Sequence, residues 1–345
     1  MKDDQGFVVA VVGATGMVGR TMIQVLEERR FPVRRLLPFA SARSAGTTVR
    51  FQGTEVPVAE LTESALRSCG ADVALFSAGA SVSRQFSPVA AQAGTIVVDN
   101  SSAFRMDPDI PLVVPEVNPE ALRGHRGIIA NPNCSTIQMV VALKPLHDAY
   151  GINRIVVSTY QSVTGAGRRG YDQLMAEVEG RDPEVQKFPH RIALNLIPHI
   201  DDFDEDGNTR EETKMVRETV KIMGDSGIRV AATCVRVPVT GGHSESVNIE
   251  CARPVDVQQA REFLRNAPGV VLVDEPAKAL YPMPADAGGR DEVFVGRVRR
   301  DPTVPNGLSL WIVSDNLRKG AATNAVQIAE RLVADGLLGN RRAAS

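Results

Sequence analysis

The sequence contains few cysteines, and their spacing excludes two common kinds of small structural framework. Among 345 residues there are only Cys69, Cys134, Cys234 and Cys251, and no Cys-x-x-Cys pair occurs. This spacing argues against a zinc site and against a disulfide framework, and it suits a reducing compartment. We therefore expect a cytoplasmic protein without a metal.

Excess charge and long apolar runs are missing as well. The formal net charge is −2 and there is no basic run, so nothing predicts binding to nucleic acid. No apolar run approaches the roughly 18 residues of a membrane span, and Asp3 and Asp4 do not fit the basic start of a secretory signal. We expect neither nucleic acid nor a membrane as a partner, and the length allows two domains.

A continuous apolar run at residues 7–12 leads directly into a glycine-rich loop. The loop reads Gly13-Ala-Thr-Gly-Met-Val-Gly19, and an amphipathic helix follows from about Met17 to Arg30. A strand buried on both faces, a tight glycine turn and a helix N-terminus are the parts of a dinucleotide-binding βα unit. The spacing GxxGxxG departs from the commoner GxGxxG, but the order of the elements favours a dinucleotide site over a bare βα turn.

The next expected strand, residues 33–39, bears on which dinucleotide binds. NAD sites usually carry Asp or Glu at the end of this strand, to bond the ribose 2′-hydroxyl. Here the chain reads Ser41-Ala-Arg43-Ser44 instead. A hydroxyl-rich loop with an arginine can hold a 2′-phosphate through charge-assisted hydrogen bonds. The sequence therefore predicts NADP rather than NAD, the alternative being an arginine that is simply solvated.

Alternating strands and helices predict a Rossmann-type, doubly wound N-terminal domain. Apolar runs at 73–76, 95–98 and 127–130 read as strands, and residues 84–93 read as a helix. Such sheets bind ligands at the carboxyl ends of their strands. Arg105 is the only cation in the polar loop that follows residues 95–98, so it is a candidate anion clamp.

The central motif of the chain is Asn131-Pro-Asn-Cys-Ser-Thr136. Pro132 should end the preceding strand, and Asn133 is a good N-cap, so Cys134 should open the next helix. The positive end of the helix dipole and unpaired N–H groups favour a thiolate there and could stabilise an oxyanion. Cys134 is therefore a candidate nucleophile, although a buried structural cysteine is the usual fate of a free thiol.

The second half of the chain predicts an α+β domain with a mixed sheet. We expect domains at 1–133, joined by a C-terminal helix within 319–345, and at 134–318. The amphipathic segment 320–338 should return to cover the first domain. The strands of the second domain are expected at 154–161, 229–237, 246–251, 269–273, 293–298 and 308–314, and its helices at 211–223 and 255–266.

Four polar residues of this half are candidates for binding or proton transfer. His243 lies in an expected glycine turn, where an imidazole can serve as a proton shuttle beside a cysteine, although a lone loop histidine is more often plain surface. Arg236 can hold a carboxylate in bidentate geometry. Glu211 and Lys214 stand at i and i+3 of one helix face, either as an exposed ion pair or as a site for a substrate's ammonium and phosphate groups.

Together these motifs resemble those of the aspartate-β-semialdehyde dehydrogenase family over essentially the whole chain. The shared motifs are Gly-Ala-Thr-Gly-Met-Val-Gly, Asn-Ser-Ser-Ala-Phe-Arg, Asn-Pro-Asn-Cys-Ser-Thr, Gln161 with Thr-Gly-Ala-Gly, Glu-Glu-Thr-Lys, Arg236 through His243, and Asp-Asn-Leu-Arg-Lys-Gly-Ala-Ala. The resemblance implies reversible, NADPH-dependent reductive dephosphorylation of L-4-aspartyl phosphate to L-aspartate 4-semialdehyde. It also implies a place in lysine (through diaminopimelate), methionine and threonine biosynthesis, and a homodimer or homotetramer.

The resemblance also implies roles for individual residues. Cys134 matches the family's acyl-thioester nucleophile and His243 its acid/base. Thr164 stands where many relatives have Ser. The substrate-binding matches are Gln161, Arg236 for the α-carboxylate, Glu211 for the amino group, Arg105 and Lys214 for the phosphate, and Asn133. The cofactor-binding matches are Gly13, Thr15, Gly16, Met17, Val18, Arg43, Ser44, Thr164, Gly165 and Asn316.

Two alternatives stay open at this point. One is a related acyl-phosphate reductase, such as an N-acetyl-glutamyl-phosphate reductase or a glyceraldehyde-3-phosphate dehydrogenase, whose cysteine motifs read differently. The other is a non-catalytic, NADP-binding paralogue that serves as a scaffold or sensor. The presence of both Cys134 and His243 argues against the second, because such a paralogue needs neither.

Overall fold

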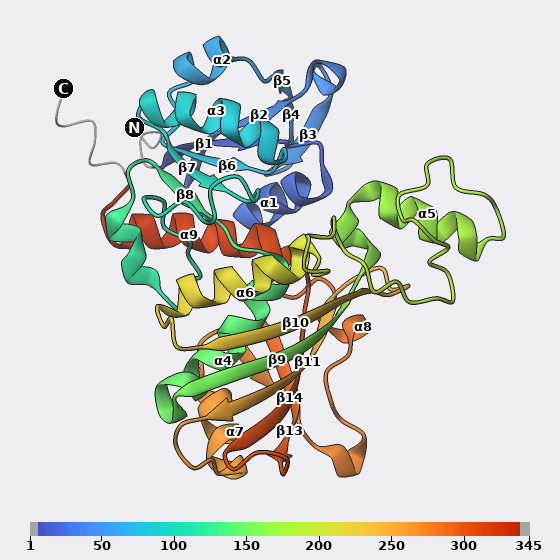
Figure 1. The fold of residues 1–345 in the computed structure, drawn as a ribbon. Helices are drawn as coiled ribbons and strands as arrows, with labels where there is room; N and C mark the ends of the chain where they lie inside the picture. Colours follow the sequence, from blue (N-terminus) through green and yellow to red (C-terminus); the bar gives the residue numbers. More distant parts are fainter. Residues whose placement is uncertain (1–5, 339–345) are drawn as a thin grey trace. The chain divides into compact units, whose positions relative to one another are not determined.

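The computed structural model describes residues 6–338, and the chain divides into two compact units (Figure 1). Unit 1 comprises the chain up to Pro132 together with the chain from Ala321 onward, and unit 2 runs from Asn133 to Gly320. Asp3, Asp4 and the two ends of the expected first domain, residues 1–5 and 339–345, lie outside the described residues. No described helix is both long enough and apolar enough to cross a bilayer.

Unit 1 is built on a six-stranded sheet in which every neighbouring pair is parallel, in the order β5-β2-β1-β6-β7-β8. The order reverses between β1 and β6, which is the switch point where doubly wound sheets bind ligands. The Rossmann-type arrangement predicted from the sequence is therefore confirmed. The strands are β1 (Phe7–Val12), β2 (Val33–Ala40), β5 (Ala59–Glu60), β6 (Val73–Phe76), β7 (Ile96–Asp99) and β8 (Ile128–Ala130).

Both faces of this sheet are covered, because alternate strand residues point to opposite sides. Val9, Val11 and Leu75 pack with α1 (Met17–Glu28) and α9 (Thr323–Ala334) in one apolar cluster. Val8, Ala10 and Phe76 pack with α2 (Glu63–Ser68) and α3 (Ala80–Gln92) in a second one. Figure 1 shows α1 and α9 on the side of the sheet opposite to α2 and α3. The C-terminal helix thus supplies part of the core of unit 1.

Several short elements of unit 1 have no counterpart in the sequence prediction. These are the hairpin of β3 (Thr48–Phe51) and β4 (Thr54–Pro57), strand β5 and helix α2. Each is too short to show a hydrophobic period. Helix α3 also begins four residues before the expected start at Arg84, directly after Gly79, whose φ of 91° ends the preceding segment. Two 3-10 turns, Ala42–Ser44 and Pro119–Gly124, complete the unit.

Unit 2 contains the mixed sheet, in the order β10-β9-β11-β14-β13-β12. The outer pairs β10–β9 and β13–β12 are parallel and the three inner pairs are antiparallel. Helices α4, α6 and α7 pack on one face of the sheet. The strands are β9 (Ile152–Gln161), β10 (Arg229–Arg236), β11 (His243–Cys251), β12 (Val270–Leu272), β13 (Val293–Asp301) and β14 (Gly307–Ser314). The helices are α4 (Cys134–Tyr150), α5 (Arg168–Val178), α6 (Arg210–Met223), α7 (Val257–Asn266) and α8 (Pro284–Ala287), and the short turns are Val163–Ala166, Pro276–Lys278 and the π-helical Arg318–Ala322.

The first residue of β11 matters for the site, because it decides where His243 lies. The sequence predicted a strand from Ser246, with His243 in the preceding turn, and this is wrong: β11 begins at His243. The turn ends at Gly242, whose φ of 75° suits glycine. His243 then pairs with Ser314 of β14, and the next residue, Ser244, pairs with Tyr160 of β9. Pairing on both sides extends the strand by three residues and buries the imidazole.

The packing of α9 generates a test of the core of unit 1. Ile328 has no exposed surface and lies in the cluster formed with α1 and the sheet. We expect Ile328→Ala to lower the free energy of unfolding by about 2–5 kcal/mol, because a cavity remains where the side chain packed. Denaturant unfolding measures the change. Arg331→Ala, at an exposed position of the same helix, should change it by less than about 1 kcal/mol; equal effects would contradict this packing.

Candidate active site

The start of α4 is fixed by the side chain of Asn133. This residue is the N-cap, and its Oδ1 accepts hydrogen bonds from the backbone N–H groups of Ser135 at 3.0 Å and Thr136 at 3.3 Å. The sequence-predicted cap is confirmed, with Cys134 as the first helical residue. These two N–H groups already serve the cap, so they are not the unpaired oxyanion donors expected from the sequence.

Glu211 connects this cap to the sheet. Its Oε1 accepts from Asn133 Nδ2 at 2.9 Å and from Gln161 Nε2 at 3.1 Å, and its Oε2 lies 3.3 Å from Lys214 Nζ. Burial alone would raise the pKa of Glu211, but the charge of Lys214 and the two hydrogen bonds outweigh burial and lower it. Four residues predicted as substrate contacts therefore form one network around an ionised carboxylate.

Two further acids belong to this network and were not predicted from the sequence. Glu218, which is buried, accepts a hydrogen bond from the backbone N–H of Asn133 at 2.7 Å. Asp201 pairs with Lys214 at 2.6 Å. Glu218 stands seven residues after Glu211 on the same face of α6, a spacing that could have indicated it. Asp201 sits in an acidic run that reads as a solvated loop, and the sequence carries no signal for its role.

Arg236 ends β10 and is almost fully buried. Its Nη1 donates to the backbone oxygen of Ser162 at 2.6 Å, and its guanidinium lies over the ring of Phe188. Burial lowers the pKa of Arg236, while the negative charges of Glu211 and of a Cys134 thiolate act in the opposite direction. The nucleophile predicted from the sequence is therefore within electrostatic range of this guanidinium.

His243 is completely buried, whereas a lone loop histidine is more often exposed. Its Nδ1 accepts the backbone N–H of Ser162 at 3.1 Å, and among the described residues Nε2 has no hydrogen-bond partner. Burial and then the positive charge of Arg236 lower the pKa of His243 to about 3. The ring is therefore neutral near pH 7, and because Nδ1 is an acceptor the proton resides on Nε2.

The turn that carries Thr164 and Gly165 lies directly on these two side chains. A Cβ atom at Gly165 would lie 2.8 Å from Arg236 Nη1 and 3.2 Å from His243 Nε2, so a side chain there would force these two groups to move. Thr164 and Asn316, both expected to contact the cofactor, are joined to each other by side-chain hydrogen bonds of 3.1 and 3.3 Å. The structure thus brings together the second-half residues that the sequence singled out.

The remaining predicted residues lie in unit 1, where the glycine loop packs closely against neighbouring backbone. A Cβ at Gly13 would lie 2.4 Å from the backbone oxygen of Ser77, and one at Gly19 would lie 2.1 Å from that of Gly13. Gly16 caps α1 without a side chain, and the first turn, which contains Met17 and Val18, carries no acid. Backbone N–H groups at a helix N-terminus free of acidic side chains suit a pyrophosphate.

Two other positions of unit 1 can hold anions. Arg43 and Ser44 lie in the 3-10 turn after β2, where Arg43 is exposed and the turn contains no acidic residue, an arrangement that fits a 2′-phosphate. Arg105 is buried, and its Nε and Nη2 donate to the backbone oxygens of Asn131 and Asn100, both at 3.0 Å. These bonds fix the guanidinium at the carboxyl ends of β7 and β8.

Another buried acid that was not predicted from the sequence is Glu245 of β11. Glu245 lies two residues after His243 on the same face of β11, between Thr159 of β9 and Ile312 of β14, and has no exposed surface. Gln138 of α4 lies beside its carboxyl group, but within the described chain neither carboxyl oxygen makes a hydrogen bond of normal geometry. Burial raises the pKa of Glu245 well above its ordinary value, which favours the neutral acid.

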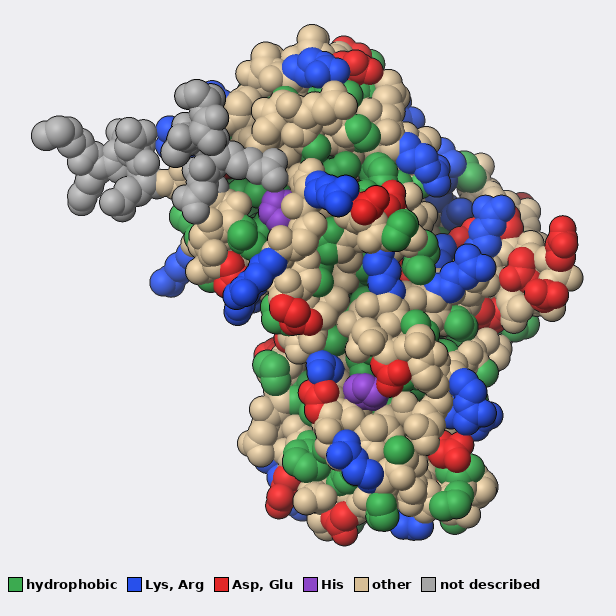
Figure 2. Space-filling model, turned by 60° about the vertical axis from the view of Figure 1, so that its left-hand side comes forward, with side chains coloured by type: hydrophobic (Ala, Val, Ile, Leu, Met, Phe, Trp, Pro, Cys, Tyr) green, Lys and Arg blue, Asp and Glu red, His purple; other side chains and the backbone are tan. Residues whose placement is uncertain are grey.

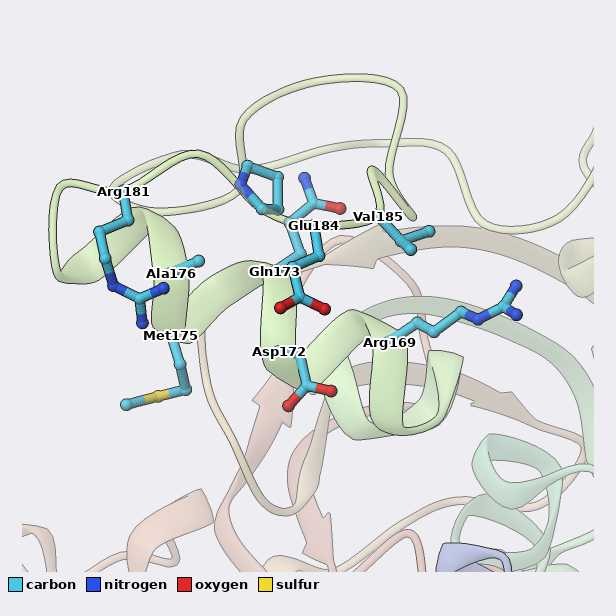
Figure 3. A pocket seen from close by; sticks show the side chains of 9 residues that line it. Arg169, Asp172, Gln173, Met175, Ala176, Arg181, Glu184 and Val185 are labelled. Carbon is cyan, nitrogen blue, oxygen red and sulfur yellow. The ribbon is translucent and has the colours of Figure 1, made fainter. Parts of the chain in front are cut away.

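A hollow on α5 is lined by none of the predicted site residues, and its charges are partly paired, Arg181 with Glu179 and Asp172 with Arg168 (Figure 3). In the described part of the chain there is no cluster of three or more His, Cys, Asp or Glu able to hold a metal. On the face drawn in Figure 2, basic and acidic side chains are interspersed.

Comparisons with known proteins define the class of the chain. Residues 8–125 match the family model "Semialdehyde dehydrogenase, NAD binding domain", and residues 143–319 match "Semialdehyde dehydrogenase, dimerisation domain". The two models agree with the parallel sheet of unit 1 and the mixed sheet of unit 2. The class that fold and site define is thus that of the semialdehyde dehydrogenases.

Individual relatives narrow the class. An aspartate-semialdehyde dehydrogenase of Aquifex aeolicus is 58% identical over 341 residues, covering 96% of this chain and 100% of its own. The crystal structure of aspartate semialdehyde dehydrogenase II from Vibrio cholerae, complexed with ASA, has a TM-score of 0.92 at 52% identity and covers 96% and 99% of the two chains. The Candida albicans enzyme with NADP has a TM-score of 0.75 at 27% identity, over 96% and 100%. The chain belongs to the aspartate-semialdehyde dehydrogenase family.

The neutral Glu245 generates a prediction about pH and stability. Its folded pKa is raised, so below about pH 4.5 both the folded and the unfolded chain are protonated and Glu245 adds no pH-dependent term to the stability. Above that pH only the unfolded chain ionises, and each further pH unit lowers stability by up to about 1.4 kcal/mol until the folded pKa is reached. Glu245→Gln should therefore be more stable than the parent at pH 8 and nearly equal to it at pH 5.

Thermal unfolding of both proteins across this pH range provides the measurement. Glu250→Gln, on the same strand but partly exposed, is the matched control and should show no comparable trend. A stability difference for Glu245→Gln that does not change with pH would mean that Glu245 is ionised in the folded chain.

Proposed function

We propose that this protein catalyses the reversible, NADPH-dependent reductive dephosphorylation of L-4-aspartyl phosphate to L-aspartate 4-semialdehyde. The observation that carries the proposal is a single buried network in which the N-cap of a helix beginning at Cys134 is bonded to Glu211 and, through it, to Gln161. The names of the Aquifex and Vibrio relatives support the same reaction.

In this proposal Cys134 is the nucleophile. Its thiolate sulfur forms a bond to the acyl carbon, and the bond from that carbon to the phosphate oxygen breaks. The products of this step are a thioester on Cys134 and inorganic phosphate. Arg105 and Lys214 are the cations that we assign to the phosphate. Lys214 would then share its charge between the phosphate, Asp201 and Glu211.

The groups that hold the aspartyl part are assigned by charge. Arg236, buried and fixed by Ser162, is suited to the α-carboxylate, which it can bind in bidentate geometry. Glu211, kept ionised by its neighbours, is suited to the ammonium group. Gln161 and Asn133 orient Glu211 through their amide nitrogens, and we assign them to the substrate site on that basis.

His243 is assigned as a proton donor. With Nδ1 occupied by the N–H of Ser162, the neutral ring has its proton on Nε2. That proton can be donated to the oxygen that gains negative charge when the thioester carbon becomes tetrahedral, or to the sulfur when its bond to that carbon later breaks. To take a proton from a thiol, Nε2 would have to be unprotonated. The N–H of Ser162 disfavours this, because it donates to Nδ1 and so leaves the ring proton on Nε2. We therefore assign thiolate formation to the helix N-terminus rather than to His243.

Unit 1 is proposed as the NADP-binding domain, with the expected ranges 1–133 and 319–345, and unit 2 as the catalytic and dimerisation domain, with the expected range 134–318. The chemistry that bound NADPH supplies is hydride transfer. The glycine loop, Thr15 and the first turn of α1 would hold the pyrophosphate of NADPH. Arg43 and Ser44 would hold its 2′-phosphate. Thr164, Gly165 and Asn316 are proposed to contact its other end.

The assembly is proposed to be a homodimer or a homotetramer built on the mixed sheet. The face of this sheet opposite α4, α6 and α7 carries partly exposed residues, among them Tyr160 and Trp311, whose rings lie 5.4 Å apart. An exposed aromatic sheet face suits a self-association surface, and the matching family model is described as a dimerisation domain. A cytoplasmic location is proposed because the four cysteines of the described chain form no disulfide bond.

The reaction is tested directly by cofactor reduction. With L-aspartate 4-semialdehyde and inorganic phosphate, NADP⁺ should be reduced at a rate that depends on phosphate, as followed at 340 nm. NAD⁺ and N-acetylglutamate semialdehyde are the controls, and both should react far more slowly. Turnover with N-acetylglutamate semialdehyde instead would identify the related reductase, and no turnover with intact NADP⁺ binding would support a non-catalytic paralogue.

The nucleophile has its own test. Cys134→Ala should reduce kcat to background, because no other group can form the thioester, while NADP⁺ binding measured by titration calorimetry should be unchanged. Cys234→Ala is the matched control: that thiol is fully buried and burial raises its pKa, so its loss should leave most of the activity. Substantial turnover by Cys134→Ala would rule out a covalent route through this residue.

A further inference from the structure

The chain leaves β14 through a tightly bonded turn from Asp315 to Gly320. The Asp315 carboxylate accepts the backbone N–H groups of Leu317 at 2.8 Å, Arg318 at 3.1 Å and Gly289 at 2.8 Å. The N–H of Gly320 reaches back to the backbone oxygen of Asp315 at 3.1 Å, a π-type bond. Single π turns are frequent at functional sites. The backbone position of Gly320 is thus fixed by hydrogen bonds inside its own turn.

Gly320 lies directly against Cys134. A Cβ at position 320 would lie 2.8 Å from the Cβ of Cys134 and 3.3 Å from its Cα, while the next nearest atom is a backbone oxygen at 3.5 Å. Its φ lies outside the left-handed range, so alanine could adopt this conformation without backbone strain. The contact with Cys134 is therefore the reason that the position requires glycine.

The same turn is also linked to His243, through the loop that carries Thr164 and Gly165. Asn316 exchanges hydrogen bonds with Thr164, and the neighbouring Gly165 packs against the His243 ring. One turn therefore contacts Cys134 through Gly320 and is tied through Asn316 to the loop that covers His243.

We propose that the Asp315–Gly320 turn positions both catalytic residues, and that Gly320 is the positioning residue for Cys134. The backbone of Gly320 limits where the Cys134 side chain can lie in the first turn of α4, while the Asn133 cap holds that turn from the other side. The catalytic role of Cys134 and His243 rests on the proposed function, but the contact of Gly320 with Cys134 does not.

Gly320→Ala tests the effect on the thiol. The added methyl group displaces the Cys134 side chain from the helix N-terminus, so alkylation of Cys134 by iodoacetamide, followed by peptide mass spectrometry, should slow and its pH midpoint should rise. If the proposed reaction holds, kcat should fall on the order of 100-fold, with a much smaller change in the KM for NADP⁺. Gly288→Ala is the matched control, because no atom lies closer than 4.0 Å to its Cβ; it should leave both readouts unchanged.

A double-mutant cycle tests the contact separately from the chemistry. Cys134→Gly removes the Cβ that the new methyl group meets, so Gly320→Ala should lower the melting temperature of the parent but much less that of Cys134→Gly. Equal losses in both backgrounds, or an unchanged alkylation profile in Gly320→Ala, would overturn the proposal. Neither readout needs a substrate, so a chain inactive toward aspartate semialdehyde would refute the proposed function while this result still stood.

Discussion

The hydrogen bonds of Asn133 are the interaction on which the site depends. Its side-chain oxygen caps the N-terminus of α4, the helix that begins with Cys134. Its amide nitrogen donates to Glu211, and its backbone N–H donates to Glu218. Both glutamates belong to α6, so the start of α4 is anchored to a neighbouring helix as well as to its own cap. A thiol in this first turn therefore has a fixed position, which a cap exposed to solvent would not give it.

Burial sets the charges of the site, and the outcome differs from one group to the next. Glu211 remains an anion because Lys214, Asn133 and Gln161 stabilise its charge by more than burial costs. His243 remains neutral because burial and Arg236 together outweigh the attraction of Glu211. Interactions between charges are strong in such a low-dielectric interior. The same interior can thus present a carboxylate to a cation and an N–H donor to a developing anion.

Local patterns in the sequence predicted the parts of this arrangement that depend on local structure. The glycine loop, the buried strands of unit 1, the Asn133 cap and the i, i+3 pair of Glu211 and Lys214 all follow from neighbouring residues. The burial of His243 does not, because it depends on how far β11 pairs with β9 and β14. Glu245 was missed for the same reason: the sequence predicted a strand only from Ser246, whereas pairing with β9 and β14 places Glu245 inside β11.

The closest contacts of the site were beyond prediction for a further reason. A sequence shows that positions 165 and 320 are glycine, but it does not show which atoms a side chain there would meet. Those atoms belong to His243, Arg236 and Cys134, far away along the chain. Two short turns therefore restrict the reactive side chains, in addition to the helix and the strands that bear them. The position of the nucleophile is in this sense a property of loop packing, and the N-terminus of α4 supplies its charge environment.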